Sequence, residues 1–90
     1  MKKSEKFYKI LRNAGITEYW ATRDFDPDAD DAYGNVLLPT DDKSVMRKVN
    51  SLYNGDSDDG YSLFVDYGSK GSDAFNAVIE CIEGIERREL

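Results

Sequence analysis

Residues 16–25 are ITEYWATRDF, a run of aromatic and β-branched residues that predicts a β-strand. Alternation along a strand places Trp20 on one face and Tyr19, Ala21 and Phe25 on the other. Neither face of this strand is cleanly polar, so we expect other elements to cover part of both.

The residues that follow this strand predict a hairpin. Residues 24–34, DFDPDADDAYG, are rich in turn-forming residues, and residues 33–38, YGNVLL, predict a second and shorter strand. The two strands are therefore expected to pair in antiparallel fashion, with the aspartate-rich segment as their connection. Pro39 is expected to end the second strand, because proline cannot donate to a sheet ladder.

Apolar side chains at helical spacing predict three helices, over residues 4–14, 40–54 and 72–88. Ser4 is the expected N-terminal cap of the first helix. Residues 61–67, YSLFVDY, predict a third strand, and their high apolar content indicates a central position in the sheet.

The first helix is expected to end in a defined way. Gly15 follows its last residue, where the chain needs a left-handed conformation, and Ile16 would then fold back onto Leu11.

The predicted elements follow one another in the order α-β-β-α-β-α. This order predicts an α+β fold, a small two-layer sandwich in which the helices cover one face of a three-stranded, mainly antiparallel sheet. A chain of 90 residues is long enough for a single domain, residues 1–90.

The composition predicts a folded protein without disulfides or membrane helices. The 40% of hydrophobic residues are enough for a folded core, and the net charge is −6. Cys81 is the only cysteine, so no internal disulfide can form and a reducing cytoplasm is the expected location. The start, MKKSEKFYKIL, lacks the features of a signal peptide, and no apolar run approaches the ~18 residues of a membrane helix. No membrane association is expected.

No enzymatic activity is expected. The chain contains no histidine, which excludes histidine-dependent triads, bases and metal ligands. Its adjacent carboxylates fall in predicted turns or a first helical turn, where solvent keeps them ionised. Cys81 has no base near it in sequence and is expected in the core or at its boundary. Residues 68–72, GSKGS, lack the GxxxxGK[ST] pattern, so no nucleotide or other cofactor is expected.

Aspartates are concentrated in two segments without any lysine or arginine, with seven in residues 24–42 and four in residues 49–69. An acidic surface repels nucleic acid and attracts basic partners. Spaced carboxylates can imitate the phosphates that basic grooves recognise, and tyrosines are favoured interface anchors. The expected partner-binding residues are Asp24, Asp26, Asp28, Asp30, Asp31, Tyr33, Asp56, Asp58, Asp59 and Tyr61.

A calcium site in the same segment is the alternative interpretation. Asp24, Asp26 and Asp28 match the first three ligand positions of an EF-hand loop, but Ala29 replaces the glycine and Asn35 replaces the final glutamate. Binding of a divalent cation by the three matching aspartates is therefore kept as a second hypothesis. A structural or assembly subunit of a mobile element is the third.

The amino-terminal helix is basic, with Lys2, Lys6 and Lys9 on one face. It lacks the aromatic and glycine pattern of a nucleic-acid-binding module, so direct binding of nucleic acid is not expected. A solvated basic face is the expected role.

In size, acidity and lack of catalytic residues, the chain resembles the small anti-CRISPR and DNA-mimic inhibitors that phages and plasmids carry. The resemblance rests on the stretches DFDPDADDAYG and DSDDGY and on the composition of the whole chain, and no family motif accompanies them. It implies an inhibitor or decoy that docks on the basic, nucleic-acid-binding surface of a partner protein.

Overall fold

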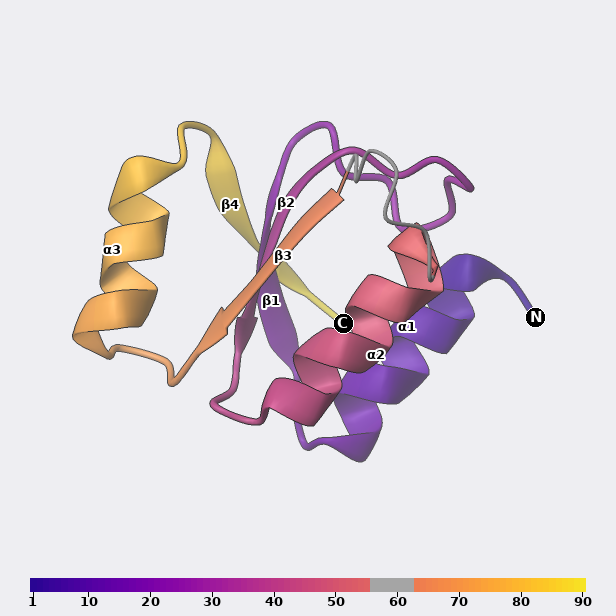
Figure 1. The fold of residues 1–90 in the computed structure, drawn as a ribbon, viewed down its shortest axis with the longest axis horizontal. Coiled ribbons are helices and arrows are strands. Elements are labelled where there is room, and N and C mark those ends of the chain that lie inside the picture. The colour runs from indigo at the N-terminus through magenta and orange to yellow at the C-terminus, as the bar shows by residue number, and fades with distance from the viewer. Residues whose placement is uncertain (56–62) are drawn as a thin grey trace.

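Three helices and a four-stranded sheet make up the structure, a computed structural model that describes residues 1–55 and 63–90 (Figure 1). The predicted α+β class is confirmed. In chain order the elements are α1 (Lys3–Asn13), β1 (Glu18–Thr22), β2 (Gly34–Pro39), α2 (Lys43–Asn54), β3 (Leu63–Gly68), α3 (Asp73–Cys81) and β4 (Ile85–Glu89).

The predicted hairpin forms the centre of the sheet. β1 and β2 pair in antiparallel fashion, with Trp20 opposite Leu37 and Ala21 opposite Val36. The strand order is β3-β2-β1-β4, so β1 and β2 each have a neighbour on both sides. The aspartate-rich segment is the connection between these two central strands, as the sequence predicts.

The prediction of a central third strand is wrong. β3 pairs in parallel with β2 and lies at an edge, so the sheet is mixed rather than mainly antiparallel. The apolar content of β3 has a different cause, because α2 packs over one of its faces. On that face Leu63 is buried, and Val65 and Tyr67 pack against the core.

The last predicted helix is too long, because its final residues form a fourth strand. α3 ends at Cys81, Gly84 adopts a positive φ of 80°, and β4 then pairs with β1 along five residue pairs. Arg87 falls within the helix predicted over residues 72–88, but it lies on β4 and donates to Glu18 of β1 at 2.9 Å. Pairing with β1, which is distant in sequence, thus makes residues 85–89 a strand although their local spacing predicts a helix.

The helices cover both faces of the sheet, and the expectation of one covered face is wrong. α1 and α2 lie on one side and α3 on the other (Figure 1). Successive residues of β1 contact the two layers: the Tyr19 ring lies 5.0 Å from that of Phe7 in α1, and the Trp20 ring lies 5.0 Å from that of Phe75 in α3. Both faces of β1 are covered, as its mixed composition predicts.

α3 is held less tightly than the other two helices. Phe75 is its only buried residue, and Val78, Ile79 and Ile82 are half-buried. Cys81 was expected in the core or at its boundary but is exposed, because the helix stops there and the chain turns away to β4.

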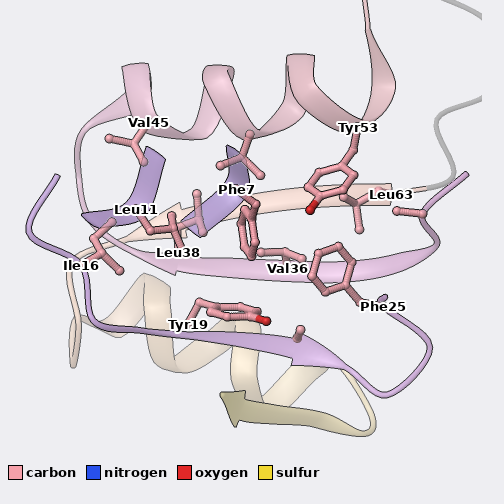
Figure 2. Close-up of a cluster of buried hydrophobic side chains, with 13 residues drawn as sticks. Phe7, Leu11, Ile16, Tyr19, Phe25, Val36, Leu38, Val45, Tyr53 and Leu63 are labelled. Atoms are coloured by element: carbon pink, nitrogen blue, oxygen red, sulfur yellow. The ribbon is translucent and has the colours of Figure 1, made fainter. Parts of the chain in front are cut away.

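The main core lies between the sheet and the helix pair α1–α2, where four aromatic rings meet. Phe7, Tyr19, Phe25 and Tyr53 point toward one another in Figure 2, with edge-to-face geometry between their rings. Phe25 belongs to the connection between β1 and β2, so the hairpin tip is part of the core.

The end of α1 forms as the sequence predicts. The backbone N–H of Ile16 donates to the carbonyl of Leu11 at 2.9 Å, and Gly15 has a φ of 74°. Ile16 and Leu11 both lie in the main core, which completes the expected hydrophobic contact of this helix end.

Candidate protein-binding surface

The acidic loop, defined here as residues 24–33, is fixed to the core at both ends. Phe25, near its start, is 2% exposed, and Ala32, near its end, is 3% exposed. Burial of these two side chains turns the intervening polar residues toward solvent. The aspartates between them are therefore displayed by an anchored segment.

Pro27 connects the middle of the acidic loop to α2. Its carbonyl oxygen accepts a hydrogen bond of 2.7 Å from the hydroxyl of Tyr53. Burial raises the pKa of the Tyr53 phenol well above its usual value, so this hydroxyl stays protonated and keeps donating even where an exposed tyrosine begins to ionise.

Asp28 caps α1 from a distance of 24 residues in sequence. Its Oδ1 accepts from the backbone N–H of Ser4 at 3.2 Å, whereas Lys2, the residue at the capping position, supplies no side-chain cap. The expectation that Ser4 is the cap is wrong, because Ser4 is a buried residue inside the first turn. Hydrogen bonds from the Ser4 hydroxyl and backbone N–H hold the pKa of Asp28 below its usual value. Asp28 therefore has a structural role.

Replacing Asp28 with alanine should lower the melting temperature by about 4–8 °C at pH 7, because α1 loses its cap. A depressed pKa stabilises the fold above the usual pKa of aspartate, about 3.9, and this stabilisation is lost as the pH falls through the folded-state value. The difference between wild type and Asp28→Ala should thus narrow as the pH falls below the usual aspartate value and through the lowered pKa of Asp28. Circular dichroism melts at several pH values measure it.

Asp30→Ala is the matched control. It removes a carboxylate from the same loop, and this carboxylate accepts no hydrogen bond in the described part of the chain. A similar loss in both variants would contradict the capping role of Asp28.

Asp24 and Asp26 also form hydrogen bonds within the hairpin. The Thr22 hydroxyl donates to Asp24 Oδ1 at 2.7 Å and accepts from the Asn35 backbone N–H at 2.9 Å. Asp26 Oδ1 accepts from the backbone N–H of Asp28 at 3.0 Å, which closes a tight turn. Both carboxylates remain exposed, but hydrogen bonds set their directions.

Asp30, Asp31 and Tyr33 form the outward part of the acidic loop. All three are exposed, Tyr33 to 56%. Between residues 1–55 and 63–90, no ion pair involves either carboxylate. The backbone carbonyl of Asp30, rather than its carboxylate, accepts a hydrogen bond from Lys3 Nζ at 3.3 Å. These side chains are therefore available to a partner.

Four of the predicted partner-binding residues belong to the second acidic segment. Asp56, Asp58, Asp59 and Tyr61 lie outside the described residues. Within residues 1–55 and 63–90, no group of three or more carboxylate or cysteine side chains is arranged to hold a metal ion. Asp24 and Asp28, two ligands of the alternative calcium site, accept hydrogen bonds from different elements.

Phe64 is a surface residue that the sequence analysis missed. It is 60% exposed and pairs with Asn35 in the parallel ladder, two residues from Tyr33. The alternation of residues along β3 could have indicated this exposure, because Phe64 and Asp66 share the face opposite Leu63. An exposed aromatic residue thus stands at the end of the sheet where the acidic loop begins and ends.

Comparisons with known proteins add no relative. No protein-family model, no curated protein and no solved structure matches the chain. None of the helices that the structure describes has the length and apolar character needed to cross a bilayer.

Proposed function

We propose that the protein is a non-enzymatic, acidic binding module that docks its acidic loop on the basic, nucleic-acid-binding surface of a partner protein, as an inhibitor or decoy. One observation carries the proposal: the exposed carboxylates of Asp30 and Asp31 lie beside the exposed ring of Tyr33, on a loop that is otherwise anchored. Asp24 and Asp26 add negative charge along the same loop.

Anchoring matters because a pre-ordered loop loses little conformational entropy when it binds. The buried Phe25 and Ala32 and the bond from Tyr53 to Pro27 hold the loop before any partner arrives. Carboxylates held in this way steer a positively charged partner and set its orientation. Tyr33 and Phe64 supply the apolar contact area that charge alone does not.

The test is affinity capture from a host lysate at about 0.05 M and about 0.5 M salt, followed by affinity measurement with the captured protein. Electrostatic docking predicts at least tenfold weaker binding at the higher salt, because counterions screen the contact. Asp30→Asn with Asp31→Asn should weaken binding at low salt by at least tenfold without changing the melting temperature. Tyr33→Ala should also weaken it.

Glu80→Gln with Glu83→Gln provides the matched control, since it also removes two negative charges but from the region of α3. This control should bind within about twofold of the wild type. Salt-insensitive binding that survives the loss of Asp30 and Asp31 would contradict the proposal.

A further inference from the structure

α1 and α2 run antiparallel, side by side, on one face of the sheet (Figure 1). A groove of about 720 Å³ lies between them on the side away from the core. Its apolar part consists of Met1, Ile10 and Leu52. Ile10 and Leu52 are only partly buried, and Met1 is 76% exposed. The helix pair therefore leaves an apolar strip uncovered.

Four basic side chains flank this strip, Lys6 and Lys9 from α1 and Arg47 and Lys48 from α2. Among residues 1–55 and 63–90, no carboxylate lines the groove. None of the four forms an ion pair with any carboxylate in the described ranges, 1–55 and 63–90. In a chain of net charge −6, this surface is a local reversal of sign, although Asp28 and Asp30 share a neighbouring hollow with Lys6 and Asp42 interacts electrostatically with Lys48.

We propose that this groove binds an acidic amphipathic helix of a partner protein. A helix laid between two helices can place apolar side chains at i, i+3, i+4 and i+7 on the strip. Its flanking glutamates or aspartates then meet lysine and arginine on both sides, and the aliphatic stems of these basic residues extend the apolar contact. This surface has the opposite charge to the acidic loop, so the inference goes beyond the proposed function.

The lining chemistry favours a protein helix over nucleic acid. No aromatic side chain of the described residues lines the groove, so unpaired bases would find no ring there on which to stack. A phosphate backbone would use the cations but leave Ile10 and Leu52 exposed. An occupant that is both acidic and apolar uses every feature of the groove.

A second copy of the chain fits less well, although it is acidic. In its acidic loop Phe25 and Ala32 are buried in its own core, and Tyr33 offers one exposed ring rather than a stripe at helical spacing. Phe75, the main apolar residue of α3, is likewise buried against its own sheet. Neither element has a fully exposed apolar stripe to offer.

Fluorescence anisotropy with the full chain tests the proposal. The probe is a labelled synthetic helix of about 18 residues, roughly five turns, with leucine at the i, i+3, i+4, i+7 positions and glutamate on the flanks. It should bind saturably, and serine in place of leucine or lysine in place of glutamate should weaken binding at least tenfold. Amide shifts of Ile10 and Leu52 should locate the probe in the groove.

On the protein side, Lys9→Glu with Arg47→Glu should weaken binding of this probe at least tenfold. Lys43→Glu, on α2 but outside the groove, is the matched control and should stay within twofold. These residues are exposed, so circular dichroism should confirm an unchanged fold.

Three results would overturn the proposal. The first is no saturable binding of the acidic helix, or equal binding by the Lys9→Glu/Arg47→Glu variant. The second is tighter binding of a single-stranded DNA oligonucleotide at the same residues. The third is a stable wild-type oligomer in sedimentation that this variant dissociates, since the groove would then be an interface between copies.

Discussion

Phe7→Ala is expected to lower the free energy of unfolding by about 3–5 kcal/mol, the loss typical of a fully buried phenylalanine. Phe7 has no exposed surface, and its ring lies 5.0 Å from Tyr19, 5.7 Å from Phe25 and 5.8 Å from Tyr53. Edge-to-face pairs of this kind contribute roughly 0.5–1.5 kcal/mol each beyond area burial. Removing the ring opens a cavity at the point where α1, the sheet and α2 meet.

Domains of this size have unfolding free energies of about 5–15 kcal/mol, so the Phe7→Ala variant should lose a large fraction of its stability. Urea denaturation, followed by Trp20 emission, measures the shift in midpoint. Trp20 packs on Phe75 across the sheet, which makes it a probe outside the mutated cluster.

Phe64→Ala is the matched control. It removes the same atoms from a side chain that is 60% exposed, so unfolding should change by no more than about 0.5 kcal/mol. Phe64→Ala should instead weaken partner binding, because Phe64 lies at the end of the sheet that carries the acidic loop. Similar losses of stability in the two variants would show that Phe7 does not hold the core together.

The same aromatic cluster links stability to the proposed function. Phe25 and Tyr53 both contact Phe7, and they are the residues that fix the acidic loop to the core and to α2. Loss of the Phe7 ring should therefore loosen the acidic loop before the whole domain unfolds. Partner affinity of Phe7→Ala should then fall at temperatures well below its melting transition.

Local signals explain what the sequence predicts well. The end of α1 depends on Gly15 and Ile16, which are neighbours in sequence, and the hairpin depends on two adjacent apolar segments joined by turn residues. In each case the interacting residues lie close together along the chain, so the pattern and the structure coincide.

Non-local contacts explain what the sequence misses. Residues 85–89 have no strong strand pattern, and they form β4 because β1 offers an edge and Glu18 offers a partner to Arg87. Lys70 also pairs with Glu18 from another part of the chain. Neither contact has a signature in the residues around position 85, where the isoleucine spacing indicates a helix.

The acidic loop shows the same difference between local and non-local signals. The composition of residues 24–34 identifies the acidic loop, but the role of each aspartate depends on what the fold brings next to it. Asp28 meets the start of α1, whereas Asp30 and Asp31 stay outward. Sequence alone gives these three carboxylates equal weight.

Gly34→Ala tests the base of the acidic loop and should lower the free energy of unfolding by about 3 kcal/mol. A positive φ of 96° at Gly34 disfavours any side chain by about 1–2 kcal/mol. An added Cβ would also collide with the side-chain oxygens of Thr22 and Asp24. The Thr22 oxygen accepts from the Asn35 N–H, which joins β1 to the start of β2, and its hydroxyl donates to Asp24 in the loop; each bond is worth roughly 1 kcal/mol.

Gly71→Ala separates the two causes. Gly71 has a φ of 81°, and a Cβ there meets no atom within 4 Å, so this variant carries the backbone penalty alone, about 1–2 kcal/mol. Urea denaturation should therefore rank wild type above Gly71→Ala and Gly71→Ala above Gly34→Ala. Equal losses of unfolding free energy in Gly71→Ala and Gly34→Ala would mean that the Thr22–Asp24 contact does not stabilise the fold.

Partner binding gives the second readout of the same pair of variants. Because Gly34 lies directly after Tyr33, displacing Thr22 and Asp24 should disturb the loop, and Gly34→Ala should bind the captured partner at least tenfold more weakly while still folded. Gly71→Ala should bind normally, since it lies in the connection from β3 to α3. Normal binding by folded Gly34→Ala would mean that the partner does not use the ordered acidic loop.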